Sequence, residues 1–169
     1  MDENGILPED ITRICEERLK QGKQLPKVIF KKYFFFKNLI TEEIKIFFFN
    51  VYHLCKQALY VNPTGANPVG IVFSNERKRE IYKLAQRYDF LILEDDAYFF
   101  LHFLDEQPRS FLSMDEDGRV VRIDSFSKFL SAGLRLGTVT GPKPIIAKLH
   151  LHVVTTTIHP SSLSQVNYL

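Results

Sequence analysis

The sequence has few cysteines, little net charge and no long apolar run, and each shortage excludes a class of protein. Its two cysteines, Cys15 and Cys55, cannot build a disulfide framework and fit a reducing compartment. A formal net charge of +2 provides no basic surface for a nucleic acid or an anionic membrane, so we expect neither partner. No apolar run reaches the length that spans a bilayer. The amino terminus is acidic and lacks signal or transit features, so a secreted protein is not expected.

The remaining composition is that of a globular domain. The 169 residues are 45% hydrophobic and 25% charged, and a chain of this length can bury one core. Apolar residues recur at helical spacing after Pro8 and after Ser74, which predicts two helices, and further helices are expected from Pro142 and near Pro160. We expect the basic run Arg77–Arg79, in the second of these helices, to be solvated.

Short apolar runs predict the strands of a sheet. They cover residues 58–61, 90–93, 120–124 and 138–140, and the second run is apolar on both faces, as in a central parallel strand. Strands that alternate with helices predict an α/β fold, in which a mostly parallel sheet is flanked by helices.

The third of these strands leads into a segment rich in hydroxyls and cations, DSFSKFLSAGLR at residues 124–135. A lysine just past a strand end, beside donors suited to a phosphate group, is what an enzyme that uses pyridoxal phosphate needs. Lys128 would bind the cofactor aldehyde as a Schiff base, and Ser125, Ser127 and Arg135 would hold its phosphate. Taken alone, the segment fits an ordinary charged surface loop equally well.

A second motif, Glu94-Asp95-Asp96-Ala97-Tyr98, ends the preceding strand. Together the two motifs resemble the class I/II aminotransferases of pyridoxal phosphate fold type I, most closely the kynurenine/α-aminoadipate branch. The resemblance covers residues 58–169 without a gap and residues 1–27 more weakly. It implies part of the large domain of such an enzyme, truncated at both ends, from a homodimer located in the cytoplasm or in mitochondria.

The resemblance also implies a role for individual residues. Asp95 would keep the pyridine nitrogen protonated, Tyr98 would donate to the phenolic oxygen of the cofactor, and Ala97 would pack beside the ring. Lys128 would carry the proton in a transamination between an amino acid, such as 2-aminoadipate or kynurenine, and a 2-oxo acid. The catalytic residues implied are therefore Lys128, Asp95 and Tyr98, with no metal.

Two assignments involve competing neighbours. Asn62 stands in a complete Asn-Pro-Thr-Gly motif, whereas Asn67 precedes Pro-Val-Gly. Asn67, however, stands at the family's distance from Asp95, and we therefore take Asn67 as the second donor to the phenolic oxygen. Both asparagines would also serve as ordinary turn residues.

We assign Asp95 rather than Asp96 to the pyridine nitrogen by family spacing. Adjacent residues of a strand face opposite ways, so only one of the two can reach the ring.

Residues 28–57 differ from the rest of the chain, and the resemblance fails over them. They hold seven of the fifteen phenylalanines and contain no Gly, Ala, Pro, Arg, Ser or Asp. Every valine codon begins with GT and a glutamine codon can be CAG, so Val28 and Gln57 fit the two ends of an intron. We interpret the segment as a foreign insertion, either a translated intron or a true lineage-specific insertion, and expect no part of it to be ordered in the α/β core.

Two other functions compete with the aminotransferase. The effector domains of some transcriptional regulators share this fold and lysine, but they follow a DNA-binding domain, which the sequence does not contain. The second alternative is a truncated product without catalytic activity, because the resembled enzymes take further site residues from segments that would precede Met1 and follow Leu169.

Overall fold

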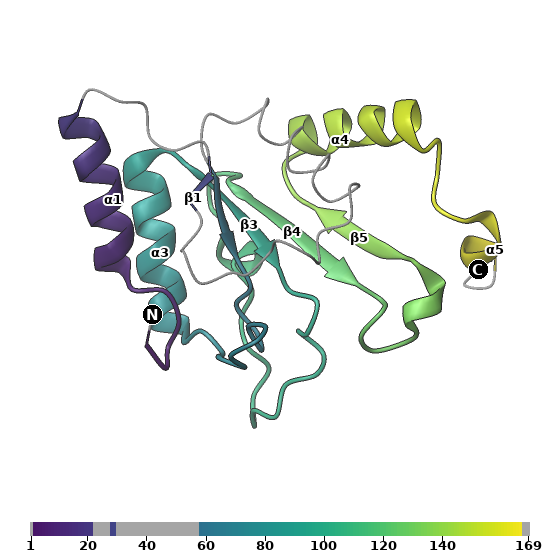
Figure 1. The fold of residues 1–169 in the computed structure, drawn as a ribbon, viewed down its shortest axis with the longest axis horizontal. Helices are drawn as coiled ribbons and strands as arrows, with labels where there is room; N and C mark the ends of the chain where they lie inside the picture. The colour runs from purple at the N-terminus through teal and green to yellow at the C-terminus, as the bar shows by residue number, and fades with distance from the viewer. Residues whose placement is uncertain (1, 22–27, 30–57, 167–169) are drawn as a thin grey trace.

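The computed structural model describes residues 2–21, 28–29 and 58–166, which form a five-stranded sheet with helices on both faces (Figure 1). The strands lie across the sheet in chain order: β1 (Val28–Ile29), β2 (Ala58–Val61), β3 (Leu91–Asp95), β4 (Val120–Ser125) and β5 (Gly137–Thr140). Neighbours from β1 to β4 run parallel, and β5 runs antiparallel to β4. The expected mostly parallel α/β sheet is therefore confirmed.

Two helices, α1 (Pro8–Lys20) and α3 (Asn75–Tyr88), cover one face of the sheet (Figure 1). The hydroxyl of Ser74 accepts a hydrogen bond from the backbone N–H of Arg77 at 3.2 Å, which caps the start of α3. The inner sides of both helices pack on alternate strand residues in one buried cluster, which includes Ile11, Cys15, Leu59, Val61, Ile81, Ala85, Ile92 and Val120. This packing follows the helical and strand periodicities of the sequence.

The opposite face carries α4 (Lys143–Thr156), which is followed by the short helix α5 (Ser162–Val166). Leu149 of α4 is buried against the strand residues that alternate with those of the first cluster: Ala58, Tyr60, Leu93 and Val121. Both faces of the central strands are thus covered, because strand side chains point alternately to the two sides. Two single turns of 3₁₀ helix, η1 (Leu112–Met114) and η2 (Ala132–Leu134), lie in the loops on either side of β4.

The basic run at the start of α3 does not behave as a solvated cluster. Lys78 is completely buried, and its ammonium donates to the carbonyl oxygen of Arg109 at 2.6 Å. Arg77 donates to the carbonyl oxygen of Ile6 at 2.8 Å, whereas Arg79 is exposed. The expectation is wrong for the first two because helical spacing places residue 78 on the same inner side as residues 81, 82 and 85.

The compositionally distinct segment contributes two residues to the sheet. Val28 and Ile29 pair with Ala58 and Leu59 at its edge, so the expectation that no part of residues 28–57 is ordered in the core is wrong for these two. The foreign origin of the segment stays a prediction, and residues 22–27 and 30–57, including Cys55 and Gln57, lie outside the described part of the chain. In the described part, none of the helices combines the length and the apolar character needed to cross a membrane.

Candidate active site

The polar residues singled out by the sequence lie where three parallel strands end. The carboxyl ends of parallel strands meet at one edge of a sheet, which is where α/β proteins of this kind bind ligands. Here β2, β3 and β4 end at Val61, Asp95 and Ser125. Because Gly137 of the antiparallel β5 pairs with Ser125, the loop of residues 126–136 both leaves and rejoins this edge (Figure 1).

Asp95 is held by side chains from β2 and from the turn that follows it. The hydroxyl of Tyr60 donates a hydrogen bond to the Oδ2 atom of Asp95. The side-chain amide of Asn62 donates to the carbonyl oxygen of Asp95 at 2.6 Å. Burial raises the pKa of Asp95, while the Tyr60 hydroxyl, the Ala97 backbone N–H and the Lys128 ammonium oppose the rise by favouring the charged form. The site therefore contains a half-buried carboxyl group surrounded by donors.

Asp96 has a different environment. Its carboxylate is buried and forms an ion pair with Arg122 of β4, with 3.2 Å between Oδ2 and Nη1. Arg122 is opposite Glu94 in the β3–β4 register, on the side of the sheet that carries α3. The two neighbouring carboxylates therefore point to opposite sides of the sheet, as the strand geometry predicted.

Lys128 lies in the turn that follows β4. Its Nζ atom is 5.6 Å from the centre of the Tyr98 ring, and its charge is close enough to Asp95 to lower the pKa of that carboxyl. The structure therefore brings together the three side chains for which the sequence predicted catalytic roles. Ala97, the fourth residue of the second motif, lies between Asp95 and Tyr98 and directs its backbone N–H to the carboxylate of Asp95.

The three residues expected to hold a phosphate group lie in the same loop. The Ser125 hydroxyl accepts from the backbone N–H of Ser127 at 3.3 Å, which folds the start of the loop. Arg135 is exposed and has a left-handed backbone, with φ at 55°, and its guanidinium donates to the carbonyl oxygen of Ala132 at 3.0 Å. No hydrogen bond joins Arg135 to either serine in the described part of the chain, so their joint role stays a prediction.

The return of this loop to the sheet depends on a glycine. A Cβ atom at Gly137 would lie 2.6 Å from the carbonyl oxygen of Asp124, closer than real side chains come. Glycine at this position therefore lets β5 pair with the end of β4.

The two competing asparagines differ in what they contact. The side chain of Asn62 is buried, and besides its bond to Asp95 its Oδ1 atom accepts from the backbone N–H of Asn67 at 3.3 Å. Asn62 thus links the turn after β2 to the end of β3. Asn67 is exposed, which is compatible with a side chain that meets a ligand, and its assignment as a cofactor donor stays a prediction.

Sequence reasoning missed two residues of this region, Tyr60 and Arg122. Each interrupts an apolar strand, and this is the signal that would have found them, because a buried polar group needs a partner. Arg122 donates to both carboxylate oxygens of Asp124, and its guanidinium stacks 4.2 Å from the centre of the Phe99 ring. It thereby connects β4 to the turn after β3.

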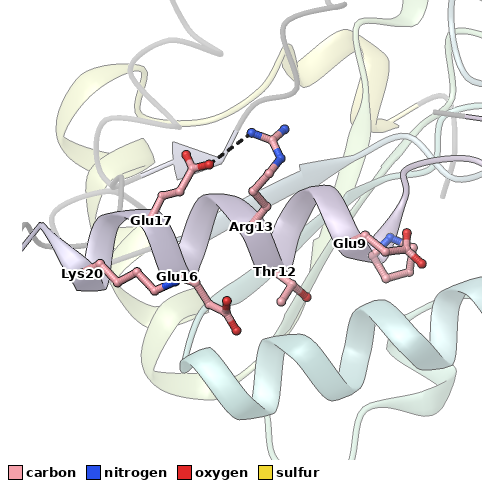
Figure 2. Close-up of a pocket in the computed structure, with 7 residues that line it drawn as sticks. Glu9, Thr12, Arg13, Glu16, Glu17 and Lys20 are labelled. Carbon is pink, nitrogen blue, oxygen red and sulfur yellow. Dashed lines mark ion pairs between the residues drawn. The ribbon is translucent and has the colours of Figure 1, made fainter.

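A shallow groove runs along α1 and is lined by none of the candidate site residues (Figure 2). Arg13 and Glu17, two of its lining residues, form an ion pair at 3.5 Å on the exposed surface of the helix. Its other lining residues are Pro8, Glu9, Thr12, Glu16 and Lys20. This is a solvated helix surface, and the convergent donors of the sheet edge define the candidate site instead.

Comparison with known proteins gives the family. Residues 57–167 match the family model of class I and II aminotransferases. The mitochondrial kynurenine/alpha-aminoadipate aminotransferase of Bos taurus is 43% identical over 165 residues, which are 98% of this chain and 33% of that protein. The rat enzyme of the same name is 53% identical over 108 residues, which are 64% of this chain and 25% of that protein.

Solved structures agree with the sequence comparison. The kynurenine aminotransferase of Pyrococcus horikoshii, solved with PMP, KYN and KYA, superposes with a TM-score of 0.76 at 25% identity over 98% of this chain and 33% of that one. Aro8 of Candida albicans superposes with a TM-score of 0.69 at 31% identity over 99% of this chain and 33% of that one. The chain thus spans between a quarter and a third of the length of these relatives.

The mostly parallel sheet and its match to solved structures show that the chain is part of the large domain of a fold type I transferase that depends on pyridoxal phosphate. The chain belongs to the class I and II aminotransferase family. The resemblance to the kynurenine/α-aminoadipate branch is confirmed over nearly the whole chain. The comparisons support an aminotransferase over the effector domain of a transcriptional regulator.

Proposed function

We propose that the full-length protein is an aminotransferase that binds pyridoxal phosphate at the carboxyl edge of the sheet, with Lys128 as its covalent attachment point. The observation that carries this proposal is the proximity of the Lys128 ammonium to Tyr98 and to the half-buried carboxyl group of Asp95. These residue types fit the cofactor. Its protonated pyridine nitrogen needs a carboxylate and its phenolic oxygen needs a hydroxyl donor. Its aldehyde needs an amine, and its phosphate needs cationic or hydroxyl donors.

Each residue has a defined task in this proposal. When bound, the cofactor withdraws electrons from the Cα atom of the substrate, which makes its proton acidic. Asp95 holds the proton of the pyridine nitrogen, and Tyr98 with Asn67 donates to the phenolic oxygen. Lys128 Nζ accepts the Cα proton and returns it, as a general base and then a general acid. Ser125, Ser127 and Arg135 bind the phosphate, and Ala97 contacts the ring.

The proposed substrates follow the names of the relatives. Since bovine and rat kynurenine/alpha-aminoadipate aminotransferases match this chain, we assign an amino acid such as 2-aminoadipate or kynurenine as amino donor and a 2-oxo acid as acceptor. We propose a homodimer in the cytoplasm or in mitochondria, and the mitochondrial names of these two relatives favour the second location.

Chemical trapping tests the attachment point. The full-length protein should be incubated with pyridoxal phosphate, reduced with borohydride, digested and mapped by mass spectrometry. The pyridoxyl group should appear on the peptide that contains Lys128, and a Lys128→Ala variant should lose that label. A label on Lys143 or Lys148 in the wild-type protein, with none on Lys128, would refute the assignment.

A further inference from the structure

Tyr60 is a polar residue in an apolar setting. It lies in the middle of β2, is 8% exposed, and packs in a cluster with Ala58, Leu93 and Val121. Packing alone does not need the hydroxyl of this tyrosine, and burying a hydroxyl is costly unless it forms a hydrogen bond. The hydroxyl of Tyr60 donates a hydrogen bond to the Oδ2 atom of Asp95.

The register of the sheet fixes this contact. Tyr60 is opposite Leu93 in the parallel β2–β3 pair, and Asp95 is two residues further along β3. Side chains two residues apart share a face, so Tyr60 and Asp95 are diagonal neighbours at a distance that an aromatic side chain can span. The contact therefore joins the two central strands at the edge where the cofactor is proposed to bind.

The hydroxyl of Tyr60 also acts on the charge of Asp95. Burial raises the pKa of this carboxyl, and the nearby Asp124 raises it further, while Lys128, the Ala97 backbone N–H and Tyr60 lower it. Burial and the same contact raise the pKa of Tyr60, so its hydroxyl keeps its proton and acts as a donor. A donor to Oδ2 both restricts rotation of the carboxylate and favours its ionised form.

We propose that Tyr60 is a positioning residue that holds the Asp95 carboxylate ionised and oriented toward the pyridine nitrogen of the cofactor. This inference rests on the proposed function. Tyr60 touches neither the cofactor nor the substrate in this scheme and acts through Asp95, as outer residues do when they orient the ligands of a metal.

The test is the Tyr60→Phe variant of the full-length protein, which keeps the packing of the ring and removes the hydroxyl. We expect pyridoxal phosphate to bind roughly tenfold or more weakly, because a hydrogen bond to a charged group is lost. The pH midpoint of the visible absorbance of the bound cofactor should also rise, because a less firmly held proton on the pyridine nitrogen leaves the Lys128 nitrogen more basic. Tyr82→Phe is the matched control.

The control removes a comparable hydroxyl remote from the site. Tyr82 is also buried, and its hydroxyl is 3.0 Å from a carboxylate oxygen of Asp115 and 2.7 Å from one of Asp117, to either of which it can donate its single proton. Tyr82→Phe should leave both the cofactor affinity and the pH midpoint unchanged. In an Asp95→Asn background, Tyr60→Phe should add little further loss of affinity, because the two residues act as one unit.

The outcomes separate this inference from the proposed function. If borohydride labels Lys128 in wild-type protein and Tyr60→Phe has wild-type affinity and midpoint, the positioning role is overturned and the function stands. A Tyr60→Phe effect of equal size in the Asp95→Asn background, or a failure of the variant to fold, would show a structural role and overturn it as well. Absence of the Lys128 label in the wild-type protein would overturn both.

Discussion

Asp95 and Asp96 show how two identical side chains, one position apart, receive different chemistry from their surroundings. Asp95 accepts from the uncharged hydroxyl of Tyr60, and Lys128 is the cation nearby. Asp96 is paired on the opposite side of the sheet with Arg122. A carboxylate already paired with a buried guanidinium has little capacity to serve a second cation, so the geometry favours Asp95 as the partner of a pyridine nitrogen.

Substitution of the two carboxylates distinguishes their roles. Asp95→Asn keeps the shape and removes the charge, and it should lower the turnover of the full-length enzyme by on the order of a thousandfold or more. Asp96→Asn should cost about tenfold at most and act mainly by lowering the melting temperature, because Arg122 keeps its contact with Asp124. Single-turnover rates with 2-aminoadipate measure the difference. A greater loss in Asp96→Asn would show that the roles of the two carboxylates have been exchanged.

The sequence predicted the placement of single residues better than their contacts. The motif around Lys128 and the alternation of strand side chains placed Lys128, Tyr98 and Asp95 at one edge of the sheet, where the structure has them. The hydrogen bond between Tyr60 and Asp95 and the ion pair between Arg122 and Asp96 were not predictable, because each depends on a strand register that is set by tertiary packing rather than by local sequence. A tyrosine or arginine inside an apolar run indicates only that some partner exists.

At the scale of elements, β3 is tied to η1 by a buried glutamate. Glu94 is completely buried, and its carboxylate accepts from the backbone N–H groups of Phe111 and Leu112 at 2.6 and 3.0 Å. Burial nevertheless outweighs these bonds and raises the pKa of Glu94 to about 7. The long connection from β3 to β4 is thus held by a group that titrates near neutral pH.

This raised pKa predicts a pH dependence of stability. A glutamate whose pKa is about 7 in the folded state and 4.5 in the unfolded state stabilises the fold fully below pH 4.5, and this contribution is lost as the pH rises through 7. The loss is at most about 3 kcal/mol. Glu94→Gln cannot titrate, so urea unfolding should show the wild-type protein losing more stability than the variant between pH 5 and pH 8. Equal losses in the two proteins would contradict the prediction.

Most elements were predictable from periodicity, and the failures have a common cause. The structure has strands and helices at each place where the sequence analysis expected them, with shifts at their ends: β3, for example, is Leu91–Asp95 instead of 90–93. The charge of Lys78 suggested exposure, whereas its helical position places it on the buried side of α3. Its hydrogen-bond acceptor, the Arg109 carbonyl, comes from a loop distant in sequence. Local sequence predicts which side of an element a residue occupies, but not which acceptor forms a hydrogen bond with it there.

At the scale of the whole molecule, the compositionally distinct residues 28–57 stand between α1 and the stretch that contains the proposed site. Residues 58–166 contain every proposed site residue, and the family match begins at residue 57. Removal of residues 28–57 would join Lys27 directly to Ala58, the first residue of β2. It would also remove the two-residue edge strand β1 while leaving the pairing of β2, β3, β4 and β5 intact.

Deletion of residues 28–57 from the full-length protein should raise its soluble yield and leave labelling of Lys128 by pyridoxal phosphate unchanged. The reason is that the deletion removes seven of the fifteen phenylalanines, in runs that promote aggregation, and no proposed site residue. A matched variant of unchanged length, with serine at residues 34–36 and 47–49, should give most of the same gain if apolar content is the cause. Sequencing transcripts across residues 20–60 should detect a form that joins the codons of Lys27 and Ala58. A deletion variant that is less soluble, or no longer labelled at Lys128, would instead identify the segment as a working part of the fold.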